Sequence, residues 1–179
     1  LVIGSFLRKD HPLFAQRLRQ LAKKWGKVSL LSVAGDDPLI KLHAHLAVSP
    51  ADLPRALAAV VKAAARLKGE LVPPGLEAVE PCPISEAIAS SLLAGEKRAL
   101  FLGNAAEQNP QAAQLHALAL ELARLTGASC GFLGEGANSV GGHVAKALPT
   151  ALNAYEMFAQ PRKAYVLLGV EPELDCHNP

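Results

Sequence analysis

Three predominantly apolar runs, each of which stops at a glycine, constrain most strongly what this chain can fold into. They lie at residues 1–3, 98–102 and 163–168, and they end at Gly4, Gly103 and Gly169. Continuous apolar character is typical of strands that are buried on both faces, as in a parallel sheet. Ligands of open α/β sheets bind outside the carboxyl ends of the strands. The glycine ends therefore predict either a ligand site or the remnant of one.

Segments with the helical spacing of apolar residues lie between these runs. They predict helices at 12–25, 50–68, 84–94 and 110–126, and short helices near 144–148 and 150–157. Further strands are expected at 28–33 and 44–48. On the first helix the predicted inward face is Leu13, Phe14, Leu18, Leu21, Ala22 and Trp25. The alternation of strands and helices predicts an α/β protein with a Rossmann-like three-layer fold and a mainly parallel sheet.

We interpret residues 1–179 as one α/β domain made of two halves. The first half is 1–69, a proline-rich connection occupies 70–83, and the second half is 84–179. The chain begins inside one strand-like run and stops just after another. We therefore expect it to be a fragment of a longer polypeptide, and to be soluble as a fragment.

Charge and hydropathy argue against two classes of partner. The net charge is +2, and basic residues are not interleaved with aromatic ones, so no nucleic-acid partner is expected. No apolar run approaches the ~20 residues of a membrane span, so no direct membrane insertion is expected. The first helix carries a basic face around Arg17 and Lys24. We interpret this face as solvated, with an acidic partner surface as the alternative.

Candidate metal ligands and nucleophiles do not form a recognisable set, so no catalytic or metal residue is predicted. Cys82, Cys130 and Cys176 lie far apart without a C-x-x-C pair, which suits a reducing compartment. His43 and His45 would share one face of a strand, and Asp36–Asp37 suits a solvated turn. The other histidines are isolated in the sequence, at His11, His116, His143 and His177.

A glycine-rich stretch at 130–142 invites comparison with a phosphate-binding loop. Gly134 and Gly136 have the Gly-x-Gly spacing of such a loop. A dinucleotide fingerprint, however, should follow a strand directly and enter a helix. A long predicted helix ending at Gly127 precedes this stretch instead. Ordinary loop geometry is the favoured interpretation, and a bound phosphate is the alternative.

Several motifs resemble the molybdopterin oxidoreductase family. They are the strand and Gly4-Ser5 turn before His11-Pro12, the partial Ser49–Asp52 match to a Pro-Gly-Thr-Asp loop, and the segments 122–127, 136–142 and 164–172. The last three segments closely resemble one branch of that family, the large iron–sulfur subunit of bacterial NADH-quinone oxidoreductase (respiratory complex I). The resemblance covers nearly the whole chain.

The departures from the family concern its cofactor-binding positions. Phe6 stands where cofactor-binding relatives have an asparagine, and residues 32–38 do not reproduce their Asp-Pro-Arg segment. The large iron–sulfur subunit keeps the fold without molybdenum, and its iron–sulfur clusters lie on other segments. The resemblance thus implies a scaffold without a cofactor of its own, within a parent chain that carries iron–sulfur clusters.

The resemblance also implies partners and a location. The partners would be the rest of the same chain and other subunits of the peripheral arm, at the cytoplasmic face of the inner membrane. The alternative is a pterin- or dinucleotide-binding domain of a cofactor-bearing oxidoreductase. Its vestigial site would comprise Gly4, Ser5, Gly103, Asn104, Gly134, Gly136 and Asn138.

Overall fold

The computed structural model describes residues 1–35, 37–136 and 138–175, which fall into two compact units. The first unit is Leu1–Ala137 and contains a five-stranded sheet, and the second is Asn138–Pro179. Both predicted halves contribute strands to this one sheet, and the predicted boundary at 70–83 stays a prediction.

The sheet is parallel throughout, with the strand order β3-β2-β1-β4-β5. Its strands are β1 (Val2–Ile3), β2 (Ser29–Ser32), β3 (Ala44–Ala47), β4 (Ala99–Leu102) and β5 (Ser129–Phe132). The central strand β1 pairs Val2 with Leu30 on one side and with Phe101 on the other. The predicted α/β fold with a mainly parallel sheet is confirmed.

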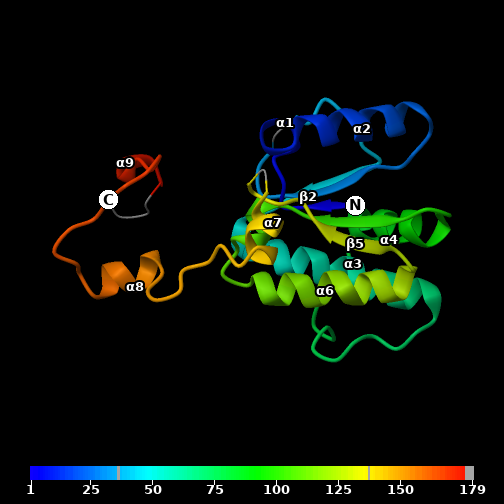
Figure 1. The fold of residues 1–179 in the computed structure, drawn as a ribbon. Helices are drawn as coiled ribbons and strands as arrows, with labels where there is room; N and C mark the ends of the chain where they lie inside the picture. The colour runs from blue at the N-terminus through cyan, green and yellow to red at the C-terminus, as the bar shows by residue number, and fades with distance from the viewer. Residues whose placement is uncertain (36, 137, 176–179) are drawn as a thin grey trace. The chain divides into compact units, whose positions relative to one another are not determined.

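Helices cover both faces of this sheet (Figure 1). On one face α2 (Pro12–Lys23) packs through Ala15, Phe14 and Leu18 against β1 and β2. On the other face α3 (Leu53–Lys68), α4 (Pro83–Ala94) and α6 (Ala112–Thr126) form the larger core with the inner strands. Short elements complete the unit: α1 (Leu7–Asp10), η1 (Pro50–Asp52) and α5 (Asn104–Glu107).

Helix α3 is buried almost all round because its neighbours α4 and α6 pack on both of its flanks. Small residues such as Ala58 and Ala64 permit this close approach. Ser49 caps η1 by accepting a hydrogen bond from the Asp52 N–H, and Gly69 ends α3 in the left-handed conformation. Gly127 ends α6 in the same conformation.

The second unit contains α7 (Ser139–Val144), α8 (Ala154–Ala159) and α9 (Pro172–Asp175). The prediction of a buried strand at 163–168 is wrong. These residues are not in a strand, and Val166 and Leu168 are 95% and 92% exposed. A strand needs a neighbouring strand to pair its backbone, and residues 138–175 contain none.

Three further expectations are corrected in the first unit. Residues 129–132 form β5, where the sequence predicts a loop, because β4 pairs with this segment despite the poor β-former Gly131. Helix α6 begins at Ala112 rather than at Pro110. Leu13, Leu21 and Trp25 are exposed rather than inward-facing, and α2 ends before Trp25 is reached.

Within the described residues, every helix is too short or too polar to span a membrane.

Candidate functional site

The carboxyl ends of β1 and β4 are the place where this fold would hold a ligand. The chain runs outward from β1 to β2 and β3 and then crosses back to β4 on the other side of β1. In doubly wound sheets the crevice at such a reversal is the usual binding site. Gly4 and Gly103 follow the two strands directly.

The backbone after β1 turns sharply and packs against the backbone after β4. Gly4 adopts a left-handed conformation with φ 61°, donates its N–H to Leu31 O (2.8 Å) and accepts from Ala105 N–H (2.9 Å). A Cβ atom placed on Gly4 would lie 2.6 Å from Ala106 N. Only glycine permits both this conformation and this approach without strain.

The turn after β4 mirrors this contact. The N–H of Gly103 donates to Ile3 O (2.8 Å). A Cβ atom on Gly103 would lie 2.8 Å from Gly4 O and closer still to Ser5 Cβ. The backbones that follow β1 and β4 therefore lie in direct contact with each other.

Three polar atoms next to this contact lie buried without a hydrogen-bond partner among the described residues. They are Ser5 Oγ, His11 Nε2 and Asn104 Oδ1. Leaving such a group unpaired costs roughly 1–3 kcal/mol, so each would favour a partner. Because Ser5 Oγ and His11 Nε2 bond neither to each other nor to another group in the described ranges, they do not form a nucleophile–base pair.

Charged groups lie at the outer edge of the same end of the sheet. Partial burial raises the pKa of Glu107, the neighbouring Glu135 carboxylate raises it further, and His11 opposes both effects. Glu107 is itself exposed, so these shifts describe a solvated acidic edge rather than an enclosed acid–base centre.

The structure brings together four of the seven residues of the predicted vestigial site: Gly4, Ser5, Gly103 and Asn104. Gly134 and Gly136 lie in the loop that follows β5, whose first residue Leu133 donates its N–H to Leu102 O (2.7 Å). Asn138 belongs to the second unit, as the N-cap of α7.

The other predicted residues have ordinary structural settings. Ser32 Oγ donates to Ala34 O (2.8 Å), so His45 Nε2–H donates to Ser32 Oγ (2.7 Å). Cys82 and Cys130 are free thiols, and no cluster of three or more His, Cys, Asp or Glu side chains suited to a metal occurs among the residues that the structure describes. Asp36, Cys176 and His177 lie outside the described residues.

Sequence reasoning missed Lys62, which fastens the proline-rich connection to the core. Its side chain is 4% exposed, and Nζ donates to Glu77 O (2.7 Å) and approaches Glu80 Oε1 (3.3 Å). The signal in the sequence was a single lysine inside the apolar stretch from Val60 to Ala65. This contact is structural and lies away from the strand ends.

Comparisons with models of protein families, with curated proteins and with solved structures found no significant match to this chain.

Proposed function

We propose that this chain is a non-catalytic scaffold domain of the large iron–sulfur subunit of an NADH-quinone oxidoreductase. The parent complex transfers electrons from NADH through flavin and iron–sulfur clusters to quinone, coupled to ion translocation. In this proposal the domain holds no cofactor, and the iron–sulfur clusters belong to other segments of the parent chain. Its partners are those segments and other subunits of the peripheral arm, at the cytoplasmic face of the inner membrane.

One structural observation carries the scaffold part of the proposal. The Gly4 turn packs on Ala106, and Gly103 packs on Ser5, in the crevice where a doubly wound sheet would hold its ligand. The replacement of the family's asparagine by Phe6 agrees with the loss of a ligand, because the phenyl ring offers no hydrogen bond. The assignment to the large iron–sulfur subunit itself rests on the sequence motifs.

Co-purification tests the assignment. An antibody against this domain should isolate, from detergent-solubilised membranes of the source cells, an assembly that oxidises NADH with a quinone acceptor. Isolation of an assembly without this activity would contradict the assignment. Metal analysis and absorbance of the purified domain test the scaffold part. Stoichiometric molybdenum or an iron–sulfur spectrum would contradict that part.

A second candidate function is the binding of a pterin or dinucleotide at the strand ends. The observation that favours it is the set of unpartnered polar atoms on Ser5, His11 and Asn104. Calorimetric titration with NADH, FAD and a guanine dinucleotide separates the two candidates. Saturable binding that Asn104→Ala abolishes would favour the second function, whereas no heat at millimolar ligand would leave the scaffold as the better account.

A further inference from the structure

The side of α2 that faces away from the sheet carries a row of exposed side chains. The inward side packs on β1 and β2 through Phe14, Ala15 and Leu18. The opposite side places four exposed residues at successive spacings of four, three and four. They are Leu13, Arg17, Gln20 and Lys24, which we call the outer row. Side chains at this spacing lie in line along an α-helix, so the outer row runs for roughly 16 Å.

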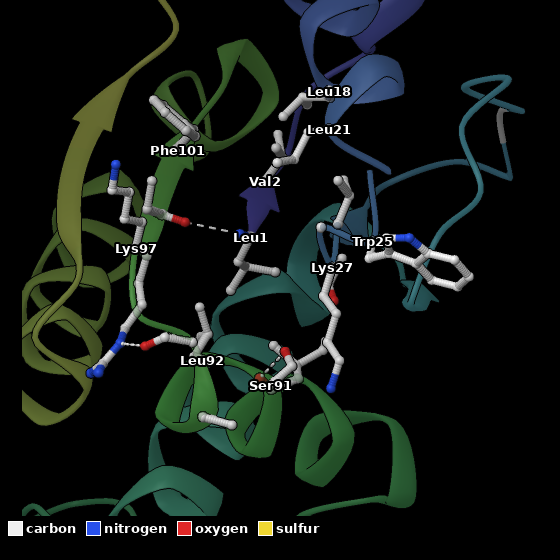
Figure 2. Close-up of a pocket in the computed structure, with 18 residues that line it drawn as sticks. Leu1, Val2, Leu18, Leu21, Trp25, Lys27, Ser91, Leu92, Lys97 and Phe101 are labelled. Carbon is white, nitrogen blue, oxygen red and sulfur yellow. Dashed lines mark hydrogen bonds between the residues drawn. The ribbon is translucent and has the colours of Figure 1, made fainter. Parts of the chain in front are cut away.

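The outer row is separate from the surroundings of Leu1. Figure 2 shows the hollow at the amino end of the sheet, in which the Leu1 amino group donates to Ala99 O (2.9 Å). Helix α2 contributes Leu18 and Leu21 to the lining of this hollow, and no residue of the outer row lines it. The outer row therefore belongs to a different surface of the protein.

Positive charge is concentrated around the outer row. Residues 1–35 contain seven of the 18 basic residues of the chain and one of its 16 acidic residues, Asp10. The ion pairs among the described residues all lie on α3, α6 and residues 70–80. Arg17 and Lys24 thus form no ion pair within the part of the chain that the structure describes. Their charges are available to carboxylates of another molecule.

Helix α2 does not neutralise these cations itself, because its sequence contains no carboxylate. Glutamate–lysine pairs four residues apart stabilise exposed helices, but α2 places two cations, Arg19 and Lys23, at that spacing. Lys24 at the end of the helix interacts favourably with the helix dipole, whereas Arg17 lies in the middle and gains nothing from it. Leu13 adds apolar surface to the row, since it is 84% exposed. The fold itself uses neither the charge of Arg17 nor the side chain of Leu13.

We propose that the outer row of α2 docks an acidic helix of a partner protein. Side chains at spacings of four and three are those that meet when two helices pack side by side with nearly aligned axes. Two carboxylates of the partner, seven residues apart, would pair with Arg17 and Lys24, and an apolar side chain would cover Leu13. This inference does not depend on the assignment to an NADH-quinone oxidoreductase.

A lipid surface and a nucleic acid fit the outer row less well. A helix that lies on a membrane turns a broad apolar face towards it, but the apolar face of α2 packs on the sheet and leaves Leu13 as the one apolar side chain of the row. Proteins that bind single-stranded nucleic acid combine cations with aromatic side chains, and the outer row contains no aromatic residue. The net charge of +2 is also small for a nucleic-acid-binding domain.

The test follows the amide signals of the isotope-labelled protein during titration with a stapled helical peptide at low salt. The peptide carries a leucine at the centre of one face and glutamates four and eleven residues from it on both sides, so that it can dock in either direction. Saturable shifts should appear at Leu13, Arg17 and Lys24. The affinity should fall as salt is added, because the pairs are exposed to solvent. A peptide with lysines in place of the glutamates should cause no shifts.

Charge reversal separates the outer row from the general charge of the protein. Arg17→Glu/Lys24→Glu should bind the peptide at least tenfold more weakly, because two attractions become repulsions. Arg55→Glu/Lys97→Glu is the matched control: it makes the same change of net charge at exposed residues of other elements, and it should lose less than threefold. The milder Arg17→Gln/Lys24→Gln should lie between the parent protein and the double reversal, and it keeps the test valid if the reversal disturbs the fold.

Leu13→Ser tests the apolar part of the contact. It should weaken binding about threefold and leave the melting temperature nearly unchanged, since the side chain is exposed in the free protein. An affinity for the peptide equal to that of the parent protein would show that the partner makes no apolar contact at this position, contrary to the proposal.

Several results would overturn the proposal as a whole. They are an absence of shifts in the outer row at millimolar peptide, an unchanged affinity in both charge variants of the row, and an equal loss in the control. Cosedimentation with phosphatidylglycerol vesicles that the double reversal abolishes would also overturn it, because the outer row would then serve a lipid surface. So would self-association of the protein that the double reversal abolishes, since the occupant would then be a second copy.

Discussion

The two ends of the sheet differ in what occupies them. At the carboxyl end the backbones that follow β1 and β4 lie in direct contact, at a distance that only glycine allows at Gly4. At the amino end a hollow of about 460 Å³ lies between α2 and α4, and Leu1, the first residue of the sequence, lines it. The difference teaches that the elements around one parallel sheet can pack closely at one end of the strands and loosely at the other.

The largest expected effect comes from forcing the closed end apart. Gly4→Ala should lower the free energy of unfolding by about 3 kcal/mol, because it combines left-handed strain with a Cβ in contact with the Ala106 backbone. Gly69→Ala is the matched control, since Gly69 has φ 73° but open space around it. It should lose only about 1 kcal/mol in urea unfolding. Equal losses would mean that the strand ends are not in close contact.

The same contact can be tested from its other side. Gly103→Ala should destabilise the protein by about 1–3 kcal/mol, and Ser5→Gly in the same chain should restore part of that loss by removing the opposing Cβ. The measurement is a double-mutant cycle in urea. Strict additivity of the two changes would contradict the direct contact.

At the amino end of the sheet a substitution should stabilise the fold. Trp25→Gly should raise the free energy of unfolding by about 1 kcal/mol, because glycine adopts the left-handed conformation without strain. Trp25→Ala is the control, since alanine keeps the Cβ and the strain, and it should change stability little. A loss of stability in Trp25→Gly would show that the indole supports the fold.

A smaller effect on stability is expected from the unpartnered hydroxyl of Ser5, in the turn that follows β1. Ser5→Ala should leave stability unchanged or raise it by up to about 1 kcal/mol, because no hydrogen bond to the described residues is lost. Ser85→Ala is the matched control: Ser85 Oγ donates to Cys82 O (2.7 Å) and accepts from Cys82 N–H (2.8 Å), so that variant should be destabilised. A larger loss of stability for Ser5→Ala than for Ser85→Ala would contradict this prediction, because it would show that the Ser5 hydroxyl supports the fold.

The smallest effect concerns the pH dependence at Glu107. Burial and Glu135 raise the pKa of this carboxyl in the folded state, so ionisation of Glu107 disfavours the fold. Glu107→Gln should therefore be more stable than the parent by a few tenths of a kcal/mol at neutral pH. The difference should vanish as the pH falls below the carboxyl range, which thermal melts at several pH values would show. A stability difference between the two proteins that grows on acidification would contradict this prediction.

The parallel sheet was predictable because its strands carry a strong local signal. Apolar runs that stop at Gly4 and Gly103 indicate β1 and β4 without any knowledge of their neighbours. The close contact between the two turns was not predictable, because Gly4 and Ala106 lie about a hundred residues apart in the chain. Polar and glycine residues after a strand look the same in a sequence whether they face a ligand or each other.

The wrong predictions have the same origin in tertiary structure. The segment at 129–132 is a strand because β4 pairs with it, and the more apolar segment at 163–168 is not a strand because residues 138–175 offer it no partner. Trp25 matches the apolar stripe of α2, but the helix ends at Lys23 and the following turn carries its side chain out of that stripe. Periodicity predicts a face only as far as the element continues.

The most direct test of the contrast between the two ends is an amide chemical-shift map of the isotope-labelled protein. We expect millimolar NADH to leave the amide signals of Gly4 and Gly103 unchanged, since the backbones that follow β1 and β4 lie in direct contact with each other. Saturable shifts at these two glycines would contradict the account, because they would show that the carboxyl end of the sheet still opens to a dinucleotide.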